Sequence, residues 1–588
     1  MRAFIFTLLI LITVLTSAAH AAETWRGFHC SAPSHADVPK MKKLIPELAS
    51  LHVNVLVLEV NYDYQFQSHP ELALATGMNR ADAQELLAVC RANGVRLIPG
   101  FECIGHQSAN SAGAKPGPLL KAHPEFDAAP EISQDDPKIY CREWNAADDR
   151  VYPIVFELMD ELIADFGADA MHCGMDEIFL LKESGGKTKP EIFAAAITRV
   201  HDHLAAKNVE TIMWADRLID PSVTNYGNWE ESGNGLWPAV DLIPKDIIVS
   251  PWHYEKKDAY PSPRWLMEKG FRVWPAPWKD RNAAVALLHQ AAKDAAATGH
   301  PERNLGALFT TWVRPNLYTI VPGGSTGQDE KILNDVYATV QDGMRELGEK
   351  MPPYAPAIGG EMAYTPDGAA SVSISGGEGE TIRYTMDGSD VTTESPAYAG
   401  PLKIATPTTL MARAWNESGR SMFSSARIAG TKWQDAEKLD EAEPGVLATI
   451  FHGDFRKIAD LGAAMPEDSA RQPDFALTLG AHGDHFAILF TGYLDVKTEG
   501  VYRFVLTSDD GSVLKINNEV IVDNDGLHGE QERDGSVALR AGLHPYALNY
   551  FEGTGDELLR VEWEGPGIPR QEIEKDSLKC AKIFGPEL

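Results

Sequence analysis

The first 350 residues alternate between short apolar runs and longer stretches with helical spacing. In 151–166 the apolar positions follow a period close to 3.6 residues, which predicts an amphipathic helix. Helical patterns also cover 38–51 and 81–93. The apolar runs between the helices are rich in β-branched and aromatic residues and predict eight strands, at 25–30, 54–60, 95–101, 168–173, 210–214, 246–251, 271–276 and 305–312.

Eight strand–helix repeats within 23–350 favour a closed parallel barrel. The alternative is a doubly wound open sheet, but no Gly-rich phosphate loop follows the first predicted strand. We therefore expect a (β/α)8 TIM barrel, an α/β fold, over residues 23–350.

The pattern changes after a Pro-rich linker at 351–356. Residues 361–432 read as short alternating strands with little helix, which predicts a small β-sandwich. An acidic stretch at 435–443 marks the next boundary, and 444–584 is again rich in strands. The chain is thus expected to be multidomain, with two all-β sandwich domains after the barrel.

The N-terminus has the features of a secretory signal. Arg2 precedes an apolar run at 4–15, and small residues follow up to Ala21, which predicts a signal peptide over 1–21. The run is shorter than the roughly 20 residues of a membrane span. We expect an exported mature chain, periplasmic or secreted, with no membrane span.

The charge and the cysteine spacing limit the kinds of ligand and site that the chain can have. The 588 residues include 53 Lys and Arg against 84 Asp and Glu, a formal charge of −31, which disfavours nucleic acid and leaves neutral ligands such as sugars open. None of the six cysteines forms a C-x-x-C pair, so neither a zinc site nor a redox motif is indicated. Although export permits disulfides, buried free thiols are the expectation.

Polar and aromatic residues gather where the predicted strands end, which is where a barrel places its active site. In strand order they are Arg26, His29, Glu59, Asn61, Asp63, Glu102, His106, Asp176, Glu177, Trp214, Asp216, Trp252, His253, Tyr254, Trp274, Trp278, Asp280, Trp312 and Arg314. The broad face of Trp suits the C–H face of a sugar ring, while acids, Arg and His bind hydroxyls. We therefore expect a carbohydrate site.

The sharpest local feature is the run from Met171 to Glu177, in which two adjacent acids follow a buried strand. Buried acids are costly unless they have a partner or a task. Like charges held close raise one pKa, as a general acid requires. Asp176 and Glu177 are the predicted catalytic pair.

This run resembles the His-x-Gly-Gly-Asp-Glu motif of glycoside hydrolase family 20, the β-N-acetylhexosaminidases, with His172 first and Met175 in place of the second Gly. The resemblance covers about 330 residues and implies further substrate-binding residues. These are Arg26, Glu102, His106, His172, Trp214, Trp252, Trp278, Trp312 and Arg314. Arg314 stands where the family has a carboxylate, and Trp278 lies near the position of a Tyr that contacts the acetamide.

The resemblance also implies a mechanism. The 2-acetamido oxygen of the substrate attacks the anomeric carbon, Glu177 protonates the leaving oxygen, and Asp176 stabilises the acetamide. The implied function is that of an exported exo-glycosidase that removes terminal β-linked N-acetylhexosamine from a glycan with no catalytic cofactor. Two alternatives remain: a barrel with altered specificity for acidic or sulfated glycans, and a non-catalytic glycan-binding protein.

The trailing domains resemble known modules. Residues 382–398 are similar to the immunoglobulin-like domain that follows chitobiase and hexosaminidase barrels, and 492–552 to the anthrax protective-antigen-type β-sandwich. The latter resemblance implies carbohydrate binding. Asp509 and Asp510 are weak candidates for calcium ligands, because hard oxygen donors suit that ion, but an Asp-Asp-Gly run is also a turn signature.

Overall fold

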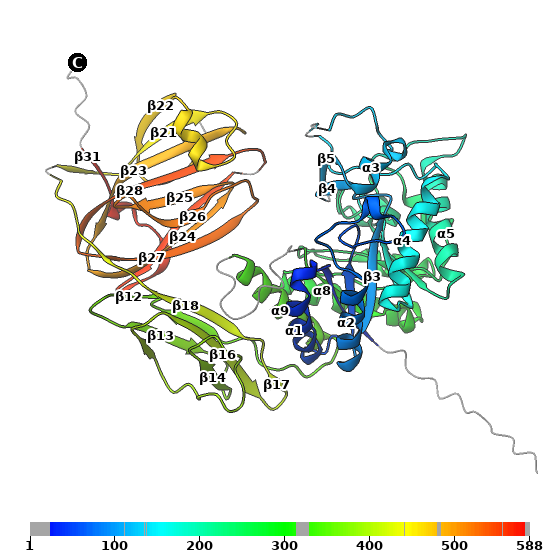
Figure 1. Ribbon diagram of the computed structural model, residues 1–588, viewed down its shortest axis with the longest axis horizontal. Helices are drawn as coiled ribbons and strands as arrows, with labels where there is room; N and C mark the ends of the chain where they lie inside the picture. Colours follow the sequence, from blue (N-terminus) through cyan, green and yellow to red (C-terminus); the bar gives the residue numbers. More distant parts are fainter. Residues whose placement is uncertain are drawn as a thin grey trace, which may run out of the picture.

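The computed structural model describes residues 24–581 apart from 111, 135, 137, 313–327, 440, 479–483 and 556. The predicted signal peptide and Arg314 lie outside these residues. In the described part, an α/β barrel is followed by two all-β domains, which lie together on one side of it (Figure 1). The predicted fold class is confirmed.

Eight parallel strands form the barrel wall, in the order β10-β1-β2-β3-β6-β7-β8-β9. Their bounds are β1 Trp25–Ser31, β2 Val55–Glu59, β3 Arg96–Cys103, β6 Ala170–Gly174, β7 Glu210–Trp214, β8 Ile248–Ser250, β9 Arg272–Val273 and β10 Gly306–Thr310. Each overlaps one of the eight predicted strands.

The sheet closes between its last two strands. The amide of Leu305 donates to the carbonyl of Val273, and that of Leu308 to Pro275, both at 2.9 Å. β9 is short because Pro275 and Pro277 follow it and offer carbonyls but no N–H. The open-sheet alternative is therefore wrong.

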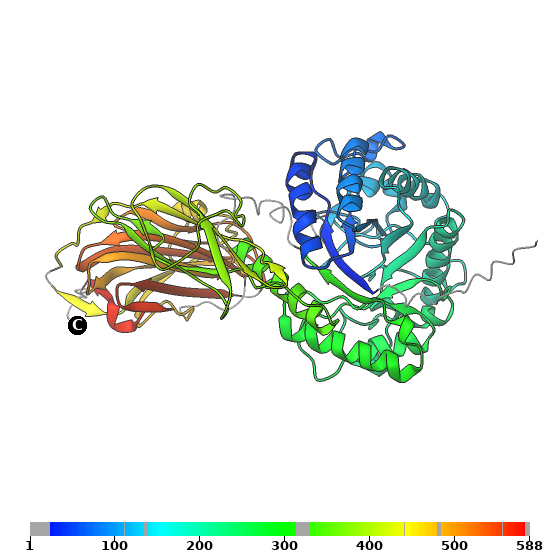
Figure 2. The same cartoon turned by 90° about the horizontal axis from the view of Figure 1, so that it is seen from below.

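Helices surround the strands as an outer ring, seen along the barrel in Figure 2. The longer ones are α1 Val38–Ser50, α2 Arg80–Ala92, α4 Val151–Phe166, α5 Lys189–Ala205, α7 Pro261–Glu268, α8 Arg281–Thr298 and α9 Gln328–Glu346. Two short helices, α3 Pro118–Ala122 and α6 Pro221–Thr224, and a hairpin of β4 Ser108–Asn110 and β5 Ala112–Pro116 lie in the connections. None of the described helices is long and apolar enough to cross a bilayer.

The middle domain packs two small sheets against each other, in the orders β11-β13-β15 and β12-β18-β16-β14, with β17 beside β16. Its strands are β11 Ala357–Gly360, β12 Ala363–Tyr364, β13 Ala370–Ser375, β14 Thr381–Thr385, β15 Leu402–Ile404, β16 Thr408–Asn416, β17 Gly419–Arg420 and β18 Ser424–Gly430. Val372, Leu410 and Ile428 belong to the core between them.

The last domain is a larger β-sandwich with sheet orders β19-β27-β24-β29-β30 and β20-β31-β23-β28-β25-β26, and β21 and β22 extend the second sheet. Its strands are β19 Trp433–Gln434, β20 Ala442–Pro444, β21 Val446–His452, β22 Asp468–Gln472, β23 Phe486–Val496, β24 Gly500–Asp509, β25 Ser512–Ile516, β26 Glu519–Asn524, β27 Gln531–Leu539, β28 Gly542–Glu552, β29 Leu558–Gly565, β30 Ile568–Glu572 and β31 Leu578–Ala581. Trp563 and Phe504 lie in its buried core.

A buried ion pair joins the middle domain to the barrel. The guanidinium of Arg413, on β16, donates to both carboxylate oxygens of Glu47, on α1, at 3.0 and 2.9 Å. Arg420 also donates to Glu47, at 2.8 Å, and Met422 packs into the barrel's outer core. These contacts fix the middle domain against α1.

Candidate active site

The two predicted catalytic acids stand on a tight turn at the carboxyl end of β6. Gly174, Met175 and Glu177 all have positive φ, at 61°, 67° and 50°. For non-glycine residues this conformation costs roughly 1–2 kcal/mol each and is maintained only by the surrounding structure. One contact that maintains it is a hydrogen bond of 2.9 Å from the Glu177 amide to the carboxylate of Asp216, which follows β7.

His106 lies between the two acids. Its Nε2 is 3.3 Å from Asp176 Oδ2 and 3.3 Å from Glu177 Oε2. His106 and its neighbour Ile104 also have positive φ, 52° and 71°, in the loop after β3. Backbone strain is thus concentrated on both loops that form the site, as is common where side-chain positions matter for chemistry.

The pKa values of the acids at this site are shifted in opposite directions. Burial opposes ionisation of Asp176, but the His106 cation outweighs it and holds the pKa of Asp176 below its usual value. Burial likewise opposes protonation of His106, yet Asp176 and Glu177 keep its pKa well above the ordinary value. Burial, with Asp176 and Glu59 nearby, raises the pKa of Glu102 well above its usual range. Asp176 is therefore ionised near neutral pH, whereas Glu102 keeps its proton to higher pH than an ordinary Glu.

A buried pair extends this network away from the acids. Asp216 accepts a hydrogen bond of 2.6 Å from Arg217 Nε, and the Arg217 side chain is fully buried. Burial raises the pKa of Asp216 to about 6 although Arg217 lowers it. Asp216 thus connects the Glu177 backbone to the loop after β7.

Aromatic rings cluster at the carboxyl ends of the barrel strands, the same end as the acids. Trp214, at the end of β7, lies 5.8 Å from Trp312 and 4.3 Å from His172 between ring centroids. Trp312 Nε1 donates to the Tyr254 hydroxyl at 2.9 Å. Tyr254 stacks on Trp252 at 5.1 Å and meets Trp278 edge to face at 5.4 Å. The four predicted tryptophans therefore belong to one cluster, which Tyr254 and Trp214 link together.

Several buried polar atoms here have no hydrogen-bond partner in the described part of the chain. They are Glu102 Oε2, His172 Nε2, Asp176 Oδ1, Trp214 Nε1, Trp252 Nε1 and Trp278 Nε1. Buried polar atoms are normally satisfied, so a cluster of exceptions points to a polar ligand or to water. Indole N–H groups, a carboxylate and a neutral imidazole suit the hydroxyls and amide of a sugar. The imidazole is neutral because burial, with His29 nearby, lowers the pKa of His172 to about 3.

Comparison with known families decides what this barrel is. Residues 24–277 match the family model of the glycosyl hydrolase family 20 catalytic domain, residues 361–425 that of the chitobiase/beta-hexosaminidase C-terminal domain, and residues 443–577 that of the PA14 domain. The barrel carries a family 20 catalytic-domain match over residues 24–277, and two β domains that match known modules follow it.

Solved structures similar to the chain include a chitobiase from Flavobacterium johnsoniae, at 16% identity and a TM-score of 0.39 over 55% of this chain and 50% of the other. A family 20 exo-β-N-acetylglucosaminidase from Vibrio harveyi, solved in complex with N-acetylglucosamine, matches at 15% identity and a TM-score of 0.38 over 54% of each chain. The PA14 domain of an antifreeze protein matches at 16% identity and a TM-score of 0.20, over 26% of this chain and 99% of that domain.

The matched region spans about half the length of the Flavobacterium chitobiase. No curated protein matches the chain.

One predicted substrate-binding residue, Arg26, lies away from the acid site. Arg26 lies at the start of β1, where its Nε donates to the His52 carbonyl at 2.7 Å and its Nη1 pairs with Glu349 at 3.1 Å. His52 follows the end of α1 and Glu349 follows α9, so Arg26 stands at the amino-terminal face of the barrel. The acids stand at the opposite face, and Arg26 is a structural residue.

Two other strand-end residues also belong to the scaffold. Trp274 is fully buried and packs edge to face on Trp25 at 5.1 Å, within the barrel. Asp280 caps the first turn of α8 by accepting the amides of Asn282 and Ala283.

Three residues join the site although the predicted catalytic and substrate-binding sets omit them; two of the three, Asp216 and Tyr254, were named only among the strand-end residues. Asp216 and Tyr254 follow predicted strands, so their positions at the carboxyl ends were the available signal. Tyr140 lies near Glu177, and burial together with the Glu177 carboxylate raises the pKa of the Tyr140 hydroxyl. It lies in an irregular connection before α4, where no sequence periodicity marks it.

The candidate calcium ligands lie in the PA14 domain. Asp509, Asp510 and Glu552 each offer an oxygen within 4.8 Å of the others. However, both oxygens of Asp510 already accept backbone amides, from His528 at 2.7 Å and Gly553 at 2.8 Å. The carboxylate of Asp510 therefore holds two loops together, which fits the turn interpretation.

All six cysteines are buried free thiols, as expected from the sequence.

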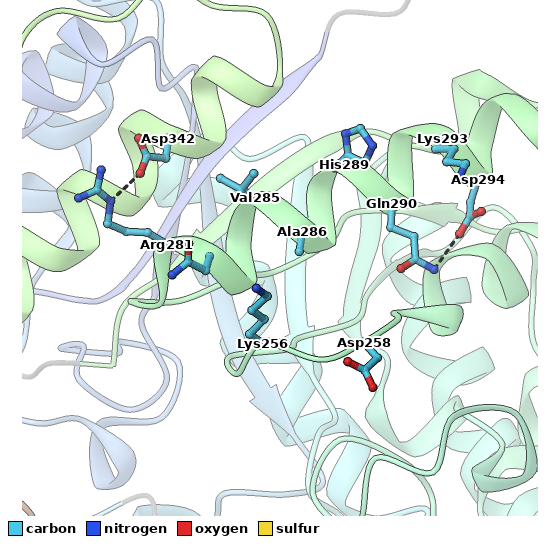
Figure 3. Close-up of a pocket in the computed structure, with 11 residues that line it drawn as sticks. Lys256, Asp258, Arg281, Val285, Ala286, His289, Gln290, Lys293, Asp294 and Asp342 are labelled. Carbon is cyan, nitrogen blue, oxygen red and sulfur yellow. Dashed lines mark hydrogen bonds and ion pairs between the residues drawn. The ribbon is translucent and has the colours of Figure 1, made fainter.

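A hollow on the barrel's outer surface lies along α8 (Figure 3). It has a volume of about 860 Å³ and is lined mainly by charged side chains such as Lys256, Lys293 and Asp258. None of its lining residues belongs to the acid site.

Proposed function

We propose that the chain is an exported exo-glycosidase that hydrolyses terminal β-linked N-acetylhexosamine by substrate-assisted retention. The observation that carries this proposal is the placement of Asp176 and Glu177 on one turn, each 3.3 Å from the same His106 nitrogen. Conventional glycosidases place two carboxyl groups on either side of the scissile bond, about 5–5.5 Å apart for retention and about 6.5–9.5 Å for inversion. Two adjacent acids on one turn suit a mechanism in which the substrate supplies the nucleophile.

In this mechanism the acetamide oxygen bonds to the anomeric carbon as the glycosidic C–O bond breaks. Glu177 gives its proton to the leaving oxygen, and the product is a cyclic oxazolinium. Glu177, now a carboxylate, takes a proton from water, whose oxygen opens the ring at the anomeric carbon. Asp176 is kept ionised by His106, so it accepts the acetamide N–H and balances the positive charge of the oxazolinium.

The rest of the pocket supports a sugar ligand. Trp214, Trp252 and Trp312 belong to one aromatic cluster, and buried polar atoms without a partner in the described part of the chain lie in it, of a kind that bonds to hydroxyl or amide groups. The two β domains would hold the enzyme on polysaccharide or cell-surface glycan. Export is supported by the composition of residues 1–21 alone.

The proposal is tested by assaying aryl β-N-acetylglucosaminide and β-N-acetylgalactosaminide with the wild type, Glu177→Gln and Asp176→Asn. We expect turnover by the wild type and a loss of about 10²–10⁴-fold in each variant on substrates with poor leaving groups. Absence of wild-type turnover would reject the proposal. Activity on acidic or sulfated glycans would then favour altered specificity, and glycan binding without turnover would favour a non-catalytic protein.

A further inference from the structure

The side chain of Gln107 closes the loop that follows β3. Its Nε2 donates to the backbone carbonyl of Glu102 at 3.1 Å and to that of Gly105 at 2.8 Å. Its Oε1 accepts a hydrogen bond of 2.9 Å from the hydroxyl of Tyr62, which follows β2. Backbone carbonyls can only accept, so these partners fix which way the amide group of Gln107 points. The side chain thus links the loop after β2 to the loop after β3.

Both side chains of this link are enclosed by the barrel. Gln107 is 1% exposed and Tyr62 9% exposed, and the Tyr62 ring packs edge to face on Phe101 at 5.4 Å. Burial raises the pKa of Tyr62 above its ordinary value, so the hydroxyl keeps the proton that it donates. The backbone of Gln107 is held as well, because its amide donates to the Arg142 carbonyl at 2.9 Å and its carbonyl accepts the Gly117 amide at 2.7 Å. A buried polar network that is satisfied to this degree is rigid.

The loop that Gln107 closes has a costly backbone conformation. Ile104 has φ of 71° and His106 has φ of 52°, values that residues other than glycine usually avoid. Such a conformation persists only where the surrounding structure enforces it. The two carbonyls that Gln107 binds, those of Glu102 and Gly105, come before and after Ile104 in the chain. The hydrogen bonds of Gln107 therefore join the two ends of the strained segment.

The same loop carries the imidazole that lies between the two acids. His106 Nε2 is 3.3 Å from both Asp176 Oδ2 and Glu177 Oε2. The loop also touches the acid turn through its backbone, since a Cβ on Gly105 would lie 2.8 Å from the Asp176 carbonyl oxygen. A movement of this loop therefore moves His106 relative to both acids. The other titratable groups near His106 are Glu102, Tyr140, Cys141 and Glu143.

We infer that Gln107 is a positioning residue for the proposed reaction, which acts through His106, and that Tyr62 orients it. The inference rests on the proposed function, because it takes Asp176 as the ionised acid and His106 as its partner. Gln107 is enclosed and keeps the loop after β3 in the shape in which His106 meets both acids. Without Gln107 the acids remain, but His106 is free to move away from Asp176, and the pKa of Asp176 then rises.

The test is the pH dependence of kcat/KM for hydrolysis of aryl β-N-acetylglucosaminide by the full chain. Gln107→Met keeps the length of the side chain and removes its amide. We expect kcat/KM to fall between about 10- and 10²-fold, and the acid limb of the profile to move to higher pH. Tyr62→Phe removes one hydroxyl, and we expect a loss of about fivefold with the acid limb moved in the same direction.

Tyr64→Phe is the matched control. The hydroxyl of Tyr64, which is buried and also follows β2, donates to Asp165 Oδ2 at 2.8 Å, away from the loop after β3. Its loss removes a buried hydrogen bond of the same kind, so it reports any general effect of weakened packing. We expect kcat/KM and the acid limb of Tyr64→Phe to match those of the wild type.

A double variant shows whether Tyr62 acts through Gln107. If it does, Tyr62→Phe causes no further loss of kcat/KM in the Gln107→Met background, whereas multiplied losses would overturn this part of the inference. An acid limb that stays in place in Gln107→Met and in Tyr62→Phe, while the wild type turns over substrate, would overturn the positioning role and leave the proposed function in place. If Gln107→Met does not fold, the acid limb of Tyr62→Phe decides alone. A wild type without turnover would overturn the proposed function and this inference with it.

Discussion

The carboxylate of Glu102 occupies the space that a side chain on Gly174 would need. A Cβ on Gly174 would lie 1.7 Å from Glu102 Oε2 and 2.2 Å from its Cδ. Gly174 also has φ of 61°, which favours glycine on its own account. Two separate constraints thus require glycine at the start of the turn that presents Asp176 and Glu177.

Gly174→Ala should therefore impair catalysis. The new methyl group displaces the Glu102 carboxyl, which is already close to Asp176, and the turn moves with it. We expect kcat/KM to fall about 10²-fold, the usual consequence of misplacing catalytic groups by about 1 Å. Gly185→Ala is the matched control, because Gly185 has φ of 58° but open space around its Cβ, and its kcat/KM should be unchanged. Equal activity in the two variants would contradict this role for Gly174.

His106→Gln should shift the acid limb of the pH–rate profile. Burial disfavours the charged form of Asp176, and the His106 cation is what keeps its pKa below the usual value. Without that cation the pKa of Asp176 rises, so the acid limb of kcat/KM should move to higher pH. The control is His35→Gln, since His35 is an exposed side chain paired with Asp82 at 2.7 Å. A lower rate with an unmoved acid limb would contradict the electrostatic role of His106.

Asp216 should make the folded protein less stable as pH rises through the weakly acidic range. Burial raises the pKa of Asp216 from 3.8 to about 6. The folded state then binds the proton more tightly than the unfolded state, so this stability is complete below 3.8 and is lost as pH rises through about 6. The scale is roughly 1.4 kcal/mol per unit of pKa difference.

Comparison with Asp216→Asn isolates this contribution, because Glu143 and Glu552 also have raised pKa values, each about 7 owing mainly to burial. The free energy of unfolding, measured by denaturant at several pH values, should decrease with pH more steeply in the wild type than in Asp216→Asn. Parallel curves for the two proteins would contradict the assignment.

The buried ion pair between Glu47 and Arg413, which joins the barrel to the middle domain, should contribute to the stability of the folded chain. Glu47→Gln leaves the buried Arg413 guanidinium with Asp390, at 3.0 Å, as its remaining carboxylate. Breaking a buried pair costs about 3–5 kcal/mol, and the remaining Asp390 contact places the expected loss at the lower end. Glu85→Gln, which breaks an exposed pair with Lys42, should cost less than about 1 kcal/mol. Denaturant unfolding of both variants checks this, and equal losses would contradict it.

The regular part of the molecule was predictable from sequence because apolar periodicity records which faces are buried. The eight barrel strands and the position of Asp176 and Glu177 after β6 follow from that pattern. Arg26 shows its limit: a residue in a strand may serve either end of the barrel, and Arg26 stands at the start of β1, the end opposite the acids. Strand direction would have separated it from His29.

The remaining site residues depend on long connections. Tyr140 and Trp229 lie in irregular segments, and their rings pack 4.9 Å apart. The buried Arg217 holds one of these segments by donating to the Trp229 carbonyl. Such long-range contacts leave no periodic signal along the chain. The positions of Asp216 and Tyr254 at the carboxyl ends of strands were predictable, because both closely follow predicted strands. Their roles were not, because these depend on partners from other strands.

The central claim, that the acetamide of the substrate is the nucleophile, is tested most directly by a series of aryl glycosides whose N-acetyl group carries increasing numbers of fluorine atoms. Fluorine withdraws electrons from the carbonyl oxygen and weakens it as a nucleophile, while the leaving group and the first sugar ring stay the same. The account predicts that kcat/KM of the wild type falls steeply with each fluorine added. A kcat/KM that is independent of fluorination would show that a protein group or water attacks the anomeric carbon, and would contradict the account.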